Sequence, residues 1–221
     1  AWFDSFNVLI DGKPLEEAKP RARPLTKADL DTKFDSGSSV EIEELSQFQH
    51  ASLLKLGRIW GFVKYYHPTI RKGDVNWDAE LFRVLPRVLE SRTSDEVNSK
   101  ISNWISSIGP LGTPVSTVKV GGKNLKVLAP LDWIEDEKTL GGDLSQLLIT
   151  VKNQKRESKN YYNGFVTGVG NPEFLNERTY RDMKFTDEGL KLLSLFRYWN
   201  MIEYFFPYKY LTDENWNDVL M

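Results

Sequence analysis

The feature that most constrains this chain of 221 residues is an internal repeat. Shifted by 139 positions, residues 53–81 (LLKLGRIWGFVKYYHPTIRKGDVNWDAEL) align without gaps with residues 192–220 (LLSLFRYWNMIEYFFPYKYLTDENWNDVL). Eleven of the 29 aligned positions are identical, whereas chance would give about two. The two segments therefore share an ancestor or satisfy the same structural demand.

The positions that both copies share predict a helix–loop–helix unit. Leu-x-x-Leu-x-x-x-Trp is the spacing of one buried helical stripe, and the proline that follows ends the helix because it cannot continue the hydrogen-bond ladder. Asp-x-Asn-Trp then begins the next helix, with Asn as its N-cap. We expect the two units to pack about a pseudo-twofold axis. The repeat markers are Arg58, Trp60, Tyr65, Pro68, Asn76 and Trp77, matched by Arg197, Trp199, Tyr204, Pro207, Asn215 and Trp216.

The fold class expected is mainly α: a helical domain built from two related repeats, with a small β-hairpin and an N-terminal strand. The hairpin is predicted over Val115–Leu128, where the hydrophobic period changes from helical to alternating. The predicted divisions are a strand at 1–17, which we expect to end a preceding β domain, a linker at 18–43, the first repeat at 44–110, a connecting region at 111–185 and the second repeat at 186–221.

Helix ends follow from capping signals. We predict a helix from about Glu44 to Pro68 and helices capped by Asn76 and Ser94, then a short helix opened by Asp143. Thr186 or Asp187 is expected to cap a long helix that ends near Phe206. Residues 155–183 are predicted to form an ordered but irregular connection.

Composition excludes several classes of function. The chain has no cysteine, which excludes disulfides, thiolate catalysis and cysteine-bound zinc. With 29 Lys and Arg against 31 Asp and Glu, the totals do not indicate a basic face for nucleic acid. No apolar run approaches the roughly 18–20 residues of a membrane helix. We expect no cofactor, no nucleic-acid partner and no transmembrane segment.

Few residues have the spacing of a catalytic site. The two histidines, His50 and His67, lack metal-ligand spacing, and His67 occupies the position of Phe206 in the second copy, so an aromatic helix-end position is favoured over a ligand. Ser-x-x-Lys occurs at Ser52/Lys55 and at Ser116/Lys119, in unrelated contexts, so a catalytic role is disfavoured. Gly121-Gly122 and the glycines at 164, 168 and 170 are interpreted as turn residues.

Aromatic clusters offer a second kind of site. Periodicity favours burial for Trp60, Trp199 and the repeat tyrosines, but Tyr208 and Tyr210 lie beyond the helix stop. These two are the candidates for an exposed surface that binds a sugar or a peptide.

The repeat segments resemble the region that precedes the catalytic domain in large Bacteroidetes-type members of the tail-specific (carboxy-terminal-processing) serine peptidase family. The resemblance rests on LGRIWGFVKYYHP (56–68) with NWDAEL (76–81), and on LFRYWNMIEYFFPYKY (195–210) with NWNDVL (215–220). DWI (132–134) and NPEFLNE (171–177) are similar to the same family's connecting region. The likeness covers roughly residues 45 to 221.

The resemblance implies that the catalytic Ser and Lys lie downstream of such a segment, so no catalytic residue is carried over to this chain. It implies a non-catalytic, scaffolding or substrate-presenting N-terminal region of an extracytoplasmic serine peptidase, periplasmic or associated with the bacterial outer membrane. The partners expected are the downstream peptidase core and a polypeptide substrate. Two alternatives stay open: a stand-alone helical module that binds glycan or peptide, and a free-standing hydrolase.

Overall fold

The computed structural model describes residues 9–10, 13–14, 23–112, 114–115, 129–155 and 159–220. This part of the chain is mainly helical with short antiparallel strand pairs, which confirms the predicted mainly α character. In chain order its elements are β1 (Leu9–Ile10), β2 (Lys13–Pro14), α1 (Lys27–Leu30), α2 (Gln47–Tyr66), α3 (Pro68–Arg71), α4 (Trp77–Leu89), α5 (Ser94–Ser107), the 3-10 helix η1 (Asp132–Glu135), α6 (Glu137–Lys152), β3 (Asn163–Phe165), β4 (Pro172–Phe174), α7 (Glu188–Phe205), and the 3-10 helices η2 (Lys209–Leu211) and η3 (Asp218–Leu220).

The long helix of the first repeat begins and ends on local signals. A capping box between Ser46 and Gln49 starts α2 at Gln47, slightly later than predicted. The helix ends at Tyr66, and Pro68 begins α3, where its missing N–H costs no hydrogen bond. Asp187 caps α7 by accepting the N–H of Leu190, so of the two predicted caps, Thr186 and Asp187, the second is confirmed.

Asn76 caps α4 through the N–H of Ala79, as predicted, but two other helix starts differ from the prediction. Thr93, not Ser94, caps α5, because its hydroxyl reaches the N–H of Glu96. Asp136 caps α6 well before Asp143. Gly141 has a φ of 71° and breaks the helical backbone, so residues around Asp143 form only the later part of α6.

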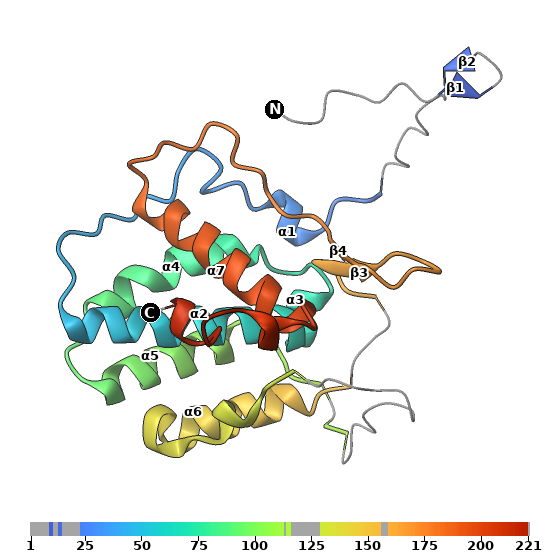
Figure 1. Ribbon diagram of the computed structural model, residues 1–221. Coiled ribbons are helices and arrows are strands. Elements are labelled where there is room, and N and C mark those ends of the chain that lie inside the picture. The colour runs from blue at the N-terminus through green and yellow to red at the C-terminus, as the bar shows by residue number, and fades with distance from the viewer. Residues whose placement is uncertain are drawn as a thin grey trace.

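α2 is the central helix of the domain. It contacts α4, α5, α6 and α7, and its residues Leu56, Ile59, Trp60, Phe62 and Val63 are fully buried. Figure 1 shows α7 crossing one side of α2, while α5 and α6 lie on the other side. The first long helix therefore organises one core from several neighbours.

α2 and α7 approach each other closely at two glycines of α2. A Cβ atom on Gly57 would lie 2.6 Å from the Phe196 ring, and one on Gly61 would lie 1.8 Å from the Asn200 side chain. Asn200 Nδ2 donates to the carbonyl of Gly57 at 3.0 Å. One step along, the rings of Tyr65 and Tyr204 meet edge to face at 5.5 Å. The crossing thus requires glycine where the backbones are nearest.

The strand pairs fall partly where the sequence did not predict them. The hairpin predicted at Val115–Leu128 lies outside the described residues except for Val115. Within the strand predicted at 1–17, the described residues are Leu9–Ile10 and Lys13–Pro14, which form a short antiparallel pair. Within the connection at 155–183, β3 and β4 pair antiparallel, with Gly164 opposite Glu173. The glycines at 168 and 170 have φ of 82° and 80° between these strands, which confirms them as turn residues. The turn interpretation is wrong for Gly164, which lies within β3.

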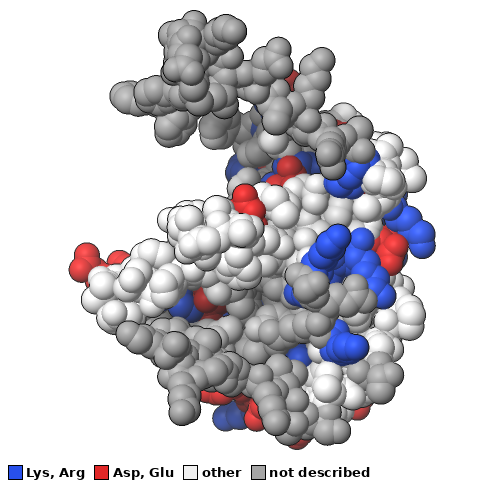
Figure 2. Space-filling model, turned by 90° about the vertical axis from the view of Figure 1, so that its right-hand side faces the viewer, with Lys and Arg blue, Asp and Glu red and all other residues white. Residues whose placement is uncertain are grey.

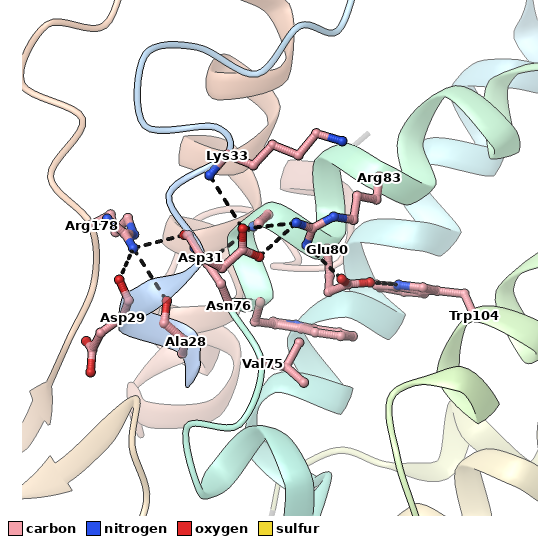
Figure 3. A network of polar contacts seen from close by, with 12 residues as sticks. Ala28, Asp29, Asp31, Lys33, Val75, Asn76, Glu80, Arg83, Trp104 and Arg178 are labelled. Carbon is pink, nitrogen blue, oxygen red and sulfur yellow. Dashed lines mark hydrogen bonds and ion pairs between the residues drawn. The ribbon is translucent and has the colours of Figure 1, made fainter. Parts of the chain in front are cut away.

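The segment from residue 23 to residue 40 packs on the helical domain. Ala28, Phe34 and Val40 are buried, and the N–H of Ala28 donates to Gly73 at 2.9 Å. Arg178 donates to the backbone carbonyls of Asp29 and Asp31 (Figure 3). It also forms an ion pair with Asp35. In the same network Arg83 bridges Asp31 and Glu80, and Trp104 donates to Glu80 at 2.9 Å.

Candidate functional site

The repeat tryptophans form two pairs with the same geometry. Trp60 and Trp77 stack with ring centroids 6.4 Å apart and planes 13° apart, and each indole N–H donates to the backbone carbonyl of the other residue. Trp199 and Trp216 stack at 6.5 Å and 12° with the same reciprocal hydrogen bonds. Each pair joins the long helix to the segment that follows the loop, and we call each a tryptophan clasp.

Four charged side chains, two of them buried and two partly buried, form a network between α2, α4, α7 and the connecting segment. Lys64 of α2 is fully buried and pairs with Glu177, which also lies 2.9 Å from Nε of Arg197 on α7. Arg197 pairs in turn with Asp78 of α4, whose side chain is 2% exposed. Lys64 Nζ also lies 4.9 Å from the ring centroids of Trp60 and Tyr162.

The electrostatics of this network suit a structural role. Burial alone would lower the pKa of Arg197, but the carboxylates of Asp78 and Glu177 outweigh burial and raise it. Burial, with a smaller contribution from Glu177, raises the pKa of Tyr65. The ion pairs of these four side chains connect α2, α4, α7 and the connecting segment to one another.

Arg58, the repeat equivalent of Arg197, has a different environment. Its guanidinium carbon lies 4.9 Å from the ring centroid of Trp133, and none of the carboxylates that the structure describes forms an ion pair with it. Its Nε is buried and has no hydrogen-bond partner. The first-copy arginine thus makes a cation–π contact where the second-copy arginine makes two ion pairs.

His67 is buried at the junction of α2 and α3. Its Nδ1 accepts the N–H of Thr69 at 3.3 Å, and Nε2 has no partner. Burial lowers the pKa of His67 to about 4, so the ring is neutral at pH 7. This agrees with an aromatic helix-end position. His50 is exposed, and no group of His, Asp and Glu suited to a metal ion occurs among the described residues.

The Ser52/Lys55 pair lies beside a pocket of about 580 Å³ between α2, α5 and the start of α6. Ser52 donates back to the carbonyl of Phe48 at 2.8 Å, within its own helix. Lys55 donates to Asn98 Oδ1 at 2.8 Å and to the carbonyl of Thr139 at 2.9 Å, and burial lowers its pKa. The Ser52 hydroxyl and the Lys55 ammonium group therefore both form hydrogen bonds within the fold. Ser116 and Lys119 lie outside the described residues.

The exposed aromatics lie where the sequence predicted them. Tyr208 is 54% exposed and Tyr210 is 74% exposed, with ring centroids 6.4 Å apart. A separate pocket of about 570 Å³ lies between the ends of α2 and α7 and β3, lined by Tyr65, Tyr66, Phe165, Tyr204 and Phe205 among others. Aromatic walls of this kind suit a sugar ring or an apolar peptide side chain.

Basic side chains gather on one face of the molecule, shown in Figure 2. On the side of α3, Arg71 and Lys72 line a small depression together with Lys155 and Pro68. The described part of the chain contains no helix that is long and apolar enough to span a membrane.

Comparison with protein-family models, with curated proteins and with solved structures gave no match to this chain. The candidate site therefore rests on its own geometry.

Sequence reasoning marked the four tryptophans of the clasps but did not pair them, and it missed most of the charge network. Trp60, Trp77, Trp199 and Trp216 were marked by the repeat, as was Arg197. Lys64 and Glu177 carried no such mark, because Lys64 aligns with Glu203 and residue 177 lies outside both copies. The available signal was Lys64 itself, a charge one turn beyond Trp60 on a helix that is otherwise apolar on that side.

Proposed function

We propose that this chain is a non-catalytic helical scaffold, built from two copies of one helix–loop–helix unit, in the amino-terminal region of an extracytoplasmic serine peptidase. The observation that carries the scaffold is the pair of tryptophan clasps, whose ring distances and angles agree within 0.1 Å and 1°. Two segments with the same sequence markers and the same pairing support one repeated unit.

Contacts between equivalent positions support the repeat further. Gly57 packs on Phe196, Gly61 on Asn200 and Tyr65 on Tyr204, and each pair is separated by 139 positions. Contact of a residue with its own equivalent is what a twofold axis between two helices produces. The domain is therefore proposed to be pseudo-symmetric about the α2–α7 crossing.

A positional role accounts for the chemistry of the buried groups. Lys64, Glu177, Arg197 and Asp78 are used for holding elements together, and a buried ionic network of this kind specifies one arrangement of its neighbours. A rigid body of this type orients a polypeptide substrate or docks against a peptidase core. The peptidase core and the extracytoplasmic location are both inferred from the resemblance to tail-specific peptidases.

The test compares the gene's complete reading frame with residues 1–221. We expect the complete product to cleave an unfolded protein and to be labelled by a fluorophosphonate that reacts with catalytic serine, while residues 1–221 do neither. Heat-denatured complete product serves as the control for non-specific labelling. Labelling of residues 1–221, or a complete product without a reactive serine, would overturn the proposal.

The second candidate is a stand-alone module that binds glycan or peptide. It is favoured by the exposure of Tyr208 and Tyr210 and by the aromatic pocket between α2, α7 and β3. Tryptophan fluorescence titrated with a panel of oligosaccharides and peptides tests it. Saturable changes that disappear in Tyr208→Ala/Tyr210→Ala would favour this candidate, and a flat titration across the panel would remove its support.

A further inference from the structure

The outer side of the second copy is an apolar surface that its first-copy equivalent does not have. We define the α7 outer face by Leu195, Tyr198 and Ile202, together with the ring of Trp216. We propose that the α7 outer face binds an amphipathic α-helix that carries an aromatic anchor and a basic flank. This inference rests on the proposed repeat, but not on the proposed peptidase.

The first copy shows how such a face is covered. Leu56 and Ile59, the equivalents of Leu195 and Tyr198, are both 0% exposed. The helix α5 packs against α2 and α4. Its Trp104 stacks on Trp77 with ring centroids 4.6 Å apart and planes 9° apart, on top of the first clasp. The cover of the first copy is thus an amphipathic helix with an indole anchor.

The second copy has no such cover among the described residues. Leu195 is 42% exposed and Tyr198 is 59% exposed. Among the aromatic rings that the structure describes, the ring of Trp216 contacts Trp199 and, edge to face at 6.1 Å, Tyr198. No described ring stacks on Trp216 as Trp104 stacks on Trp77 in the first copy, apart from its clasp partner Trp199. Clustered apolar side chains of this kind mark a surface for a partner.

The chemistry of the surface points to a helix with positive charge. An apolar stripe along a helix, beside an aromatic ring, is a surface on which an amphipathic helix can lay its own apolar face. Asp213, Glu214 and Asp218 flank Trp216 in sequence, are exposed, and form no ion pair with any basic side chain that the structure describes. Complementary charge at the rim of such a surface speeds association and selects the partner, so Lys or Arg is expected on its flank.

The probe is α5 itself, as a fluorescently labelled peptide of residues 92–109. Ser99 and Asn103, which are exposed on α5 and one turn apart, are replaced by Lys and Glu and joined as a lactam to hold the helix. A second peptide carries Trp104→Ala, and a third carries Asp95→Lys/Glu96→Lys. Each is titrated against residues 1–221, against Tyr198→Glu and against Phe185→Glu. The last variant is the matched control because Phe185 is 90% exposed and outside the face.

We expect saturable binding of the first peptide in fluorescence anisotropy. Tyr198→Glu and the Trp104→Ala peptide should each weaken it about tenfold or more, the loss of one anchor at an interface. Phe185→Glu should leave it unchanged, and the Lys-bearing peptide should bind several-fold more tightly, with a larger dependence on salt.

Three results would overturn the inference. One is equal binding to the wild-type chain and to Tyr198→Glu, and another is no saturation of any peptide up to about 1 mM. The third is concentration-dependent dimerisation in sedimentation that Tyr198→Glu abolishes, because the occupant would then be a second copy of this chain. All measurements use residues 1–221, so failure of the peptidase proposal would leave them unaffected.

Discussion

The two tryptophan clasps have the same internal geometry and different surroundings. Trp60 and Trp77 lie at the centre of a core that α4, α5 and α6 complete, and Trp104 stacks directly on Trp77. Trp199 is equally buried, but Trp216 is only partly buried and Tyr198 beside it is exposed. The pairing of the two indoles is therefore a local property of the unit, whereas its burial is supplied by neighbouring helices.

The two repeat arginines differ in the same way. Arg197 lies between Asp78 and Glu177, while Arg58 lies over the ring of Trp133 without a carboxylate among the described residues. The aligned arginines of the two sequence segments thus have different environments. The differences between the copies can be measured one position at a time.

The largest difference is expected between the two arginines. Arg197→Met leaves the buried Asp78 carboxylate without its partner and should cost about 3–5 kcal/mol of unfolding free energy in urea. Arg58→Met removes a cation–π contact and should cost about 1 kcal/mol. Adding Asp78→Leu to Arg197→Met should restore part of the stability. Equal costs for the two single variants would contradict the comparison.

The covering helix should matter almost as much. Trp104→Ala removes a ring that is 5% exposed and leaves a cavity above Trp77, so we expect a loss of about 3–4 kcal/mol. Tyr198→Ala at the open face should change stability by less than about 0.5 kcal/mol. Both are measured by urea unfolding at one pH. A large effect of Tyr198→Ala would mean that the second copy is already covered.

His67 and Phe206 give the comparison a pH dependence. The folded-state pKa of His67, about 4, lies below the unfolded value of about 6.5 because burial disfavours the charged ring. The contribution of neutral His67 to the free energy of unfolding is fully present above pH 6.5. It is lost as pH falls towards 4, by about 3 kcal/mol in total. His67→Phe, which copies Phe206, should remove this dependence between pH 6.5 and 4. An unchanged pH profile of the variant would show that other groups cause the loss.

The crossing of the two copies should give the smallest effect. Gly61→Ala places a methyl group on Asn200 and should cost about 1–3 kcal/mol, whereas Gly142→Ala, where a Cβ meets nothing within 4 Å, should be neutral or stabilising by about 0.5 kcal/mol. Exchange of the equivalents, Gly61→Asn with Asn200→Gly, should be less destabilising than the sum of the single variants. If the costs of the two single variants simply add in the double variant, residues 61 and 200 do not interact and the proposed contact is wrong.

Much of the local structure was predictable because its signals are local. Asn76 and Asp187 cap their helices with their own side chains, and Pro68 stops α2 through its own ring. The start of α6 was predicted at Asp143 and is wrong, because Asp136 caps the helix and Gly141 kinks it before Asp143. For the candidate site, the tryptophans were found, but Glu177 joins Lys64 across more than a hundred residues of chain, and no periodicity carries such a contact.

By itself the sequence determined the repeated unit: the helix core at Trp60 and Trp199, the stop at Pro68 and Pro207, and the exposure of Tyr208 and Tyr210. These follow from hydrophobic period and backbone chemistry within a few residues. Only the tertiary structure decided which copy is covered and which arginine is paired. Burial and ion pairing depend on segments far away in the chain, so two similar sequences reach different energies when different neighbours pack on them.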